Sequence, residues 1–288
     1  MPLVGVADGR IGYDSAGTGQ VVVLAHADLM DRRMWQAQID ALSDQYRVIA
    51  WDRFGFGESE PGLAGPAGAD LWAFLDALHI HRAVLVGCSM GAGHCLDAAL
   101  LRPDRVQGLV MVSPGVPGYI WPMQMHEEAL PLLVAAVSAD RLASYARGNN
   151  NAPEADVQAM ARAQVGYFAV GTRTGIDLDT APWQKMVELA ADMFRREWSE
   201  PPPVSRPAPE PPLLQRLHQI HCPTLVVDGA ADVRFVCHLA GELVSGIAEA
   251  QLITLDDTGH LPPMERPAQF NRILREFLGQ RTSDPSTM

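Results

Sequence analysis

The sequence predicts an α/β fold in which a mostly parallel central sheet is covered by helices on both faces. Segments typical of strands alternate along the chain with segments whose apolar residues recur at helical spacing. The central strand segments are apolar at every position rather than at every second one, which is typical of parallel strands buried on both faces. With 288 residues, of which 48% are hydrophobic, the chain is also large enough to bury a sizeable core.

The first 115 residues contain this alternation in a regular order. Residues 10–17 and 20–27 flank a Gly-rich turn and predict an antiparallel strand followed by a buried central strand. Helical spacing of apolar residues then alternates with short apolar runs. The predicted helices are 31–45, 69–80 and 91–103, and the predicted strands are 46–52, 82–87 and 106–114.

The alternation is interrupted after Gly115. Residues 127–146 and 182–198 have helical spacing, and no strand is predicted between them. Repeated prolines in residues 201–212 predict an extended and stiff connector. We therefore expect residues 116–217 to form a helical insertion that ends in this Pro-rich connector.

After the insertion the alternation resumes. Predicted strands at 223–229 and 250–256 are followed by predicted helices at 236–247 and 267–278. We expect residues 1–115 and 218–280 to form one core domain. The last residues, 281–288, are polar and are expected to be a disordered tail.

Charge and composition exclude several classes of partner. Acidic residues outnumber basic ones by 34 to 22, giving a net charge of −12, which argues against nucleic acid and against an anionic membrane surface. No segment has the roughly 18 consecutive apolar residues of a membrane-spanning helix, and the N-terminus lacks the pattern of a signal peptide. We therefore expect a cytoplasmic protein, for which a homodimer is one assembly that the sequence leaves open.

The cysteines do not suggest a metal or a disulfide framework. The four cysteines have no CxxC spacing and lie in apolar segments, so free buried thiols are expected. No HExxH or comparable ligand spacing occurs either. The sequence therefore predicts neither a metal nor another cofactor.

Residues 87–91 spell G-x-S-x-G, with Ser89 at the centre, where a predicted strand meets a predicted helix. A sharp turn there would expose the hydroxyl at the sheet edge and require small neighbours, which Gly87 and Gly91 provide. Free N–H groups at the helix start could stabilise negative charge. Taken alone, the motif would also fit a small residue that eases a turn.

A nucleophilic serine needs a base that a carboxylate orients, and the chain offers both in later loops. Asp232 lies just past a predicted strand, and His260 lies between the last predicted strand and helix. Both loops are at the sheet edge where open α/β sheets bind ligands. Asp228 falls within the predicted strand, and Asp256 and Asp257 are typical of solvated turn residues, so Asp232 is the preferred carboxylate.

These segments together resemble the α/β-hydrolase family over nearly the whole chain. The resemblance rests on "VVVLAHADLMDRRMW", "VIAWDRFGFGES", "VLVGCSMGAG", "CPTLVVDGAAD" and "DDTGHLPPMERPAQFNRILREFL". It implies an α/β-hydrolase fold with a helical cap between the sixth and seventh strands. It also implies Ser89 as nucleophile, His260 as general base and acid, and Asp232 as the orienting carboxylate.

The resemblance further implies two backbone donors for an oxyanion, the N–H groups of Met90 and Asp28. The sequence departs from the family at this point, because His26 is followed by Ala27 where family members usually have glycine. An Asp28 carboxylate that pointed inward would oppose the developing negative charge. We expect it instead to point outward and to bond its own backbone in a local turn.

The predicted insertion is rich in methionine and aromatic residues, which favours a mostly apolar pocket. The expected substrate is an uncharged, apolar ester or lactone of medium size, hydrolysed through an acyl-enzyme. The residues expected to line the pocket are His26, Leu29, Trp121, Met125, Phe168, Trp183 and Leu261.

Other activities use the same residues and stay open. The same Ser-His-Asp set serves carbon–carbon bond hydrolysis of β-diketones, enol-lactone hydrolysis and peracid formation. A serine at position 89 argues against the dehalogenases of the family, which use an aspartate there. A non-hydrolytic cyclase or a ligand receptor with this fold is a further alternative, which the Ala27–Asp28 departure would suit.

Overall fold

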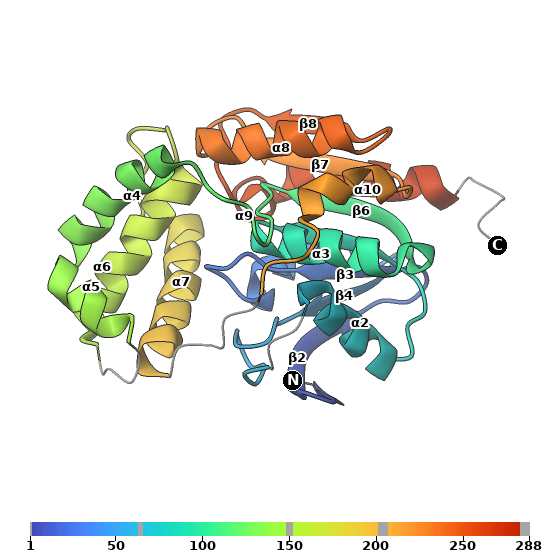
Figure 1. The fold of residues 1–288 in the computed structure, drawn as a ribbon, viewed down its shortest axis with the longest axis horizontal. Helices are drawn as coiled ribbons and strands as arrows, with labels where there is room; N and C mark the ends of the chain where they lie inside the picture. Colours follow the sequence, from blue (N-terminus) through green and yellow to red (C-terminus); the bar gives the residue numbers. More distant parts are fainter. Residues whose placement is uncertain (1, 63–65, 148–151, 201–206, 283–288) are drawn as a thin grey trace.

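A computed structural model describes residues 2–62, 66–147, 152–200 and 207–282. Eight strands of these residues form one sheet, in the order β1-β2-β4-β3-β5-β6-β7-β8 (Figure 1). β1 and β2 are antiparallel to their neighbours, and all other neighbouring strands are parallel. The strands are β1 Leu3–Val6, β2 Gly9–Ala16, β3 Val21–Ala25, β4 Arg47–Trp51, β5 Ala83–Cys88, β6 Val106–Val112, β7 Thr224–Gly229 and β8 Gln251–Leu255.

Helices cover both faces of this sheet, which confirms the predicted fold class. Along β3, Val22 and Leu24 face a core that contains α1 and α10, whereas Val23 and Ala25 face a core that contains α2, α3 and α8. The helices of this sheet-forming part are η1 Arg32–Trp35, α1 Gln36–Leu42, α2 Ala67–Ala77, α3 Met90–Leu101, η2 Pro103–Arg105, η4 Leu213–Gln219, α8 Arg234–Gly246, α9 Pro262–Glu265 and α10 Pro267–Thr282.

Between β6 and β7 the chain forms helices that lie together at one side of the sheet (Figure 1). They are α4 Met123–Ala136, α5 Ala139–Tyr145, α6 Glu154–Val165, the π-helix η3 Gly166–Val170 and α7 Ala181–Ser199. α6 packs against both α4 and α7. We call residues 123–199 the helical insertion. None of the helices in the described residues is both long and apolar enough to cross a bilayer.

Three details differ from the sequence-based prediction. The edge strand β1 was not predicted, because its exposed and half-buried positions alternate without an apolar run. The predicted helix 127–146 is two helices, since Val137 adopts an extended backbone with φ −139° and ψ 125°. α10 continues to Thr282, so the first two residues of the predicted disordered tail are helical. The other tail residues, 283–288, and part of the Pro-rich connector, 201–206, lie outside the described residues.

Candidate active site

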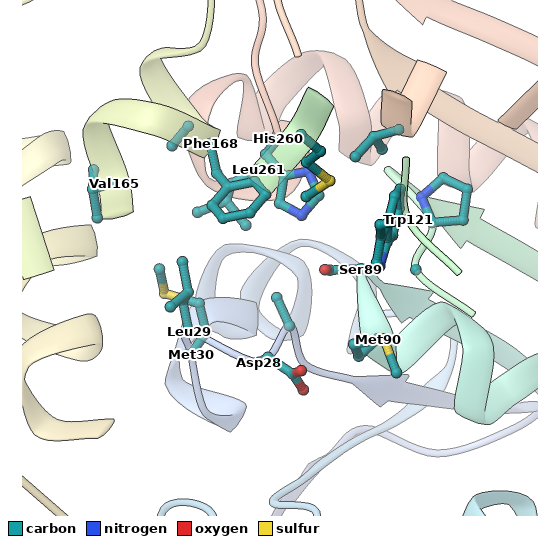
Figure 2. A pocket seen from close by; sticks show the side chains of 16 residues that line it. Asp28, Leu29, Met30, Ser89, Met90, Trp121, Val165, Phe168, His260 and Leu261 are labelled. Atoms are coloured by element: carbon teal, nitrogen blue, oxygen red, sulfur yellow. The ribbon is translucent and has the colours of Figure 1, made fainter. Parts of the chain in front are cut away.

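Ser89 occupies a sharp turn between β5 and α3. Its φ of 53° and ψ of −125° lie in a region that residues with a side chain seldom adopt. The Ser89 N–H donates to the Val112 carbonyl at 2.8 Å, and the Ser89 carbonyl accepts from the Ala92 N–H at 2.9 Å. These bonds hold the strained residue in place, and its hydroxyl points into a cavity (Figure 2).

Gly87 and Gly91 leave the space that this turn needs. A Cβ atom on Gly87 would lie 2.3 Å from the Gly91 carbonyl oxygen, and one on Gly91 would lie 2.5 Å from the His26 carbonyl oxygen. Both neighbours are backbone atoms, which cannot rotate away as a side chain can. The two glycines of the G-x-S-x-G motif are therefore explained by close approach of β5, α3 and the loop after β3.

Asp232 and His260 meet at the same edge of the sheet, one after β7 and the other after β8. Both are buried, and His260 Nδ1 donates to Asp232 Oδ2 at 2.9 Å. Burial disfavours the charged imidazolium, but the Asp232 charge and this hydrogen bond outweigh it, so the pKa of His260 is raised above its usual value. Of the aspartates near these loops, Asp256 and Asp257 are exposed.

Glu265, in α9, holds the backbone on either side of His260. Its carboxylate is buried and accepts the N–H groups of Gly259 and Leu261, each at 2.9 Å. It also pairs at 2.5 Å with Arg173, which belongs to the helical insertion. Sequence reasoning missed both residues, because a single glutamate and a single arginine carry no periodic or spacing signal.

The helical insertion reaches the histidine loop through η3. The Phe168 ring centroid lies 5.2 Å from that of His260. A Cβ atom on Gly259 would lie 1.9 Å from the Ala169 carbonyl oxygen, so only glycine fits at this contact. An aromatic side chain of the helical insertion therefore packs beside the His260 imidazole.

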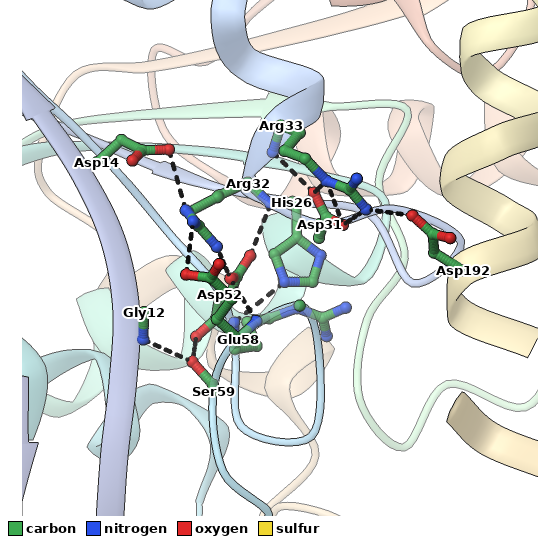
Figure 3. Close-up of polar contacts among 12 residues, drawn as sticks. Gly12, Asp14, His26, Asp31, Arg32, Arg33, Asp52, Glu58, Ser59 and Asp192 are labelled. Carbon is green, nitrogen blue, oxygen red and sulfur yellow. Dashed lines mark hydrogen bonds and ion pairs between the residues drawn. The ribbon is translucent and has the colours of Figure 1, made fainter. Parts of the chain in front are cut away.

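The turn after β3 is held by His26. Its Nδ1 donates to the Ala27 carbonyl at 2.7 Å. Its Nε2 accepts the Arg53 N–H at 3.0 Å (Figure 3). Burial and the nearby Arg53 charge lower the pKa of His26 to about 3. Both observations indicate that the His26 imidazole is neutral. Its two hydrogen bonds connect the turn at Ala27 to Arg53, just after β4.

The Asp28 side chain does not bond its own backbone as predicted. Its Oδ1 accepts from Arg53 Nη2 at 2.5 Å, and it lies on the side of Ser89 opposite His260 (Figure 2). Arg53 is buried and its guanidinium carbon lies 4.4 Å from the Phe56 ring centroid. The guanidinium therefore balances the carboxylate beside the turn.

The segment around Arg53 is held by a buried ion pair between Arg32 and Asp52. Arg32 bonds Asp52 and also pairs with Asp14 and Glu58, both at 2.9 Å (Figure 3). Both Arg32 and Asp52 are nearly inaccessible to solvent. This network fixes the loop that begins at Asp52. It thereby fixes Arg53, which bonds His26 and Asp28 on either side of Ala27.

Two backbone N–H groups near Ser89, those of Met90 and Asp28, were predicted as oxyanion donors. Within the described part of the chain, neither the Met90 N–H nor the Asp28 N–H has a hydrogen-bond acceptor. Met90 begins α3, where the first N–H groups have no partner inside the helix. Both residues border the same cavity as Ser89.

This cavity has a volume of about 250 Å³ and a mostly apolar wall (Figure 2). Of its described lining residues, only Asp28 and His260 have ionisable side chains. Leu29 and Met30 lie on one side of Ser89 and Trp121 on the other. The predicted residues that line it are Leu29, Trp121, Met125, Phe168 and Leu261.

Two residues predicted for the pocket lie elsewhere. His26 is fully buried below the Ala27 turn. Trp183 packs in the helical insertion with the Arg173 guanidinium 5.3 Å from its ring centroid. Sequence reasoning placed them by position and by residue type, which does not reveal which way a side chain points.

The chain is similar to known hydrolases over most of its length. The sequence pattern of the alpha/beta hydrolase fold family matches residues 20–267. The 2-hydroxy-6-oxononadienedioate/2-hydroxy-6-oxononatrienedioate hydrolase of Paraburkholderia phymatum is 29% identical, covering 96% of this chain and 94% of the relative. The 3-oxoadipate enol-lactonase 1 of Acinetobacter baylyi is 25% identical, covering 89% and 88%. The crystal structure of the enol-lactonase from Burkholderia xenovorans superposes with a TM-score of 0.71 at 22% identity, covering 96% of this chain and all of that one.

Proposed function

This chain belongs to the alpha/beta hydrolase fold family and is a hydrolase, and on that premise we propose that it cleaves an uncharged, apolar ester or lactone through Ser89. One observation carries the proposal. The strained Ser89 opens into an apolar cavity that it shares with His260, and His260 is bonded to the buried Asp232. The helical insertion is proposed to act as the cap of this cavity.

In the proposed reaction, His260 removes the Ser89 proton as the hydroxyl oxygen attacks the carbonyl carbon. Asp232 stabilises the imidazolium that forms. The free N–H groups of Met90 and Asp28 stabilise the oxyanion. His260 then protonates the leaving alkoxide, and water, activated by the same histidine, releases the acid from the acyl-enzyme.

The charge of the cavity wall supports a neutral substrate. The relatives' names specify carboxylate-bearing compounds, an oxononadienedioate and a 3-oxoadipate derivative. The described wall of this cavity offers no arginine or lysine to bind such a group, and its one carboxylate, Asp28, is balanced by Arg53. An anionic substrate would thus lose hydration without gaining a cationic partner.

Carbon–carbon bond hydrolysis is the second candidate, and the relatives favour it. The hydrolase from Paraburkholderia phymatum is named for a substrate of that kind and matches nearly the whole chain. The two candidates share Ser89 and His260 but differ in the substrate. A panel of p-nitrophenyl esters, aliphatic lactones and β-diketones, with and without a carboxylate, separates them by relative kcat/KM.

Ser89→Ala tests the proposed nucleophile. We expect p-nitrophenyl butyrate hydrolysis to fall by at least about 10³-fold, because the acyl-enzyme cannot form. A fluorophosphonate should add once to the wild-type chain, and peptide mass spectrometry should locate it on Ser89. The matched control is Ser245→Ala, which removes an exposed hydroxyl in α8 and should keep both activity and labelling. Retained turnover in Ser89→Ala would contradict the proposal.

A further inference from the structure

A second and larger cavity borders the first at Met30. Its volume is about 670 Å³, and η1, α7 and residues 54–61 form its wall. Met30 lines both cavities and is itself only 1% exposed. The Met30 side chain therefore stands between the space at Ser89 and the space beneath α7.

Part of the wall of the second cavity is apolar. Phe54, Phe56, Leu189 and Met193 line it together with Met30. Phe54 and Leu189 are buried, and Met193 is half-buried. An alkyl chain that passed Met30 would thus be transferred from water to an apolar surface.

All four guanidinium groups that line the second cavity are already paired, whereas its Glu197 has no cationic partner among the described residues and burial raises the pKa of that carboxyl. Arg33 bonds Asp31 and Asp192, Arg195 bonds Glu154, and Arg196 bonds Glu200 and the carbonyls of Gly57 and Ser59. Its described wall holds five carboxylates and four guanidinium groups. No guanidinium of this described wall is left to bind an anionic chain end, so the cavity suits an uncharged one.

We infer that the second cavity is the acyl-chain subsite of this hydrolase and that Met30 sets the length of acyl chain accepted. This inference rests on the proposed function. The cavity at Ser89, at about 250 Å³, is smaller than the roughly 300–1,000 Å³ of typical ligand pockets, whereas the two together fall within that range. The unbranched methionine side chain, with three rotatable bonds, can turn aside for a long chain more readily than a branched one.

Truncating Met30 should widen the passage. We expect Met30→Ala to raise the ratio of kcat/KM for p-nitrophenyl decanoate over that for p-nitrophenyl butyrate by at least about tenfold. Each additional buried methylene strengthens binding roughly fourfold, so a few extra methylenes suffice. Adding Met193→Trp, which fills the second cavity only, should remove that gain.

The matched control is Met160→Ala. Met160 is 2% exposed in α6 and borders neither cavity, so it reports the general effect of truncating a buried methionine. We expect its decanoate-to-butyrate ratio to equal that of the wild type. If Met30→Ala leaves the ratio at the wild-type value, or if Met193→Trp leaves the gain intact, the acyl-chain subsite is wrong.

A binding measurement separates this inference from the proposed chemistry. In Ser89→Ala protein, calorimetry with ethyl decanoate and ethyl butyrate should show that adding Met30→Ala strengthens decanoate binding selectively. If the proposed function is wrong, fluorophosphonate will not label Ser89, whatever the calorimetry shows. Equal effects of Met30→Ala on both esters would overturn the subsite even if Ser89 is labelled.

Discussion

His260 is held between two opposing influences. Its burial favours the neutral imidazole, while the charge and hydrogen bond of Asp232 favour the imidazolium, and the second influence is the stronger, since the pKa of His260 is raised. As the proposed general base, His260 must be neutral to accept the Ser89 proton. The rate should therefore rise with pH and reach half its plateau above pH 6.5, the usual value for histidine.

Asp232→Asn should lower the pKa of His260. Without the carboxylate charge, burial dominates, so the acidic limb of kcat/KM against pH should move to lower pH. The plateau kcat should fall by about 10³ to 10⁴-fold, because the imidazolium loses its partner and the ring its preferred tautomer. The matched control is Asp228→Asn, since burial already raises the pKa of Asp228 toward the neutral form. An acidic limb that stays in place in Asp232→Asn would refute this account.

At the scale of elements, the site depends on how closely α3 approaches the loop after β3. Gly91 lies in the first turn of α3, and a Cβ atom there would lie 2.4 Å from the Ala25 carbonyl oxygen. The same turn carries the Met90 N–H. Spacing between these elements therefore sets the position of the proposed oxyanion donors.

Gly91→Ala should lower the free energy of unfolding by about 1–3 kcal/mol, because overpacking against backbone outweighs the better helix propensity of alanine. Gly241→Ala in α8 is the matched control: a Cβ atom there meets nothing within 4 Å, so that variant should gain about 0.5–1 kcal/mol. Urea denaturation measures both. Equal shifts in the two variants would show that crowding at Gly91 is not the cause.

The elements that could be predicted from sequence are those whose burial leaves a pattern. β3, β5, β6 and β7 are apolar runs covered on both faces, so their residues alone indicate a parallel sheet. β1 leaves no such pattern. η3 was missed as well, because nothing in Gly166–Val170 distinguishes a π-helix from the end of an α-helix.

The residues of the candidate site likewise include some that the sequence predicts and some that it does not. Ser89 could be found because its turn imposes glycines on both sides. Glu265 pairs with Arg173 and Arg53 pairs with Asp28, in each case far along the chain, and such contacts leave no local trace. His26 and Trp183 were misplaced because orientation depends on packing across elements rather than on residue type.

At the scale of the whole molecule, Arg173 connects the helical insertion to the sheet-forming part. Its guanidinium bonds the Val170 carbonyl at 3.0 Å within the insertion and the Asp257 carbonyl at 2.9 Å outside it. It also pairs with the buried Glu265, which holds the backbone around His260. The Arg173 side chain therefore contributes both to the docking of the insertion and to the placement of His260.

Arg173→Met should lower the free energy of unfolding by about 3–5 kcal/mol, because Glu265 is left as an unpaired buried charge. It should also lower kcat/KM for p-nitrophenyl butyrate by at least about tenfold, since His260 loses its support. The matched control is Arg162→Met, which breaks an exposed pair with Asp179 and should cost at most about 1 kcal/mol. If both variants unfold at the same urea concentration, the connection through Arg173 is unimportant.

The contact between Gly259 and Ala169 bears on the exchange of parts between related enzymes. A chimaera that receives the insertion of another family member would bring a new pocket roof and new selectivity. It would dock only if the incoming backbone follows the path of the Ala169 carbonyl over Gly259, where no side chain fits. Compatibility between donor and recipient is thus decided at one backbone crossing, independently of the residues that contact substrate.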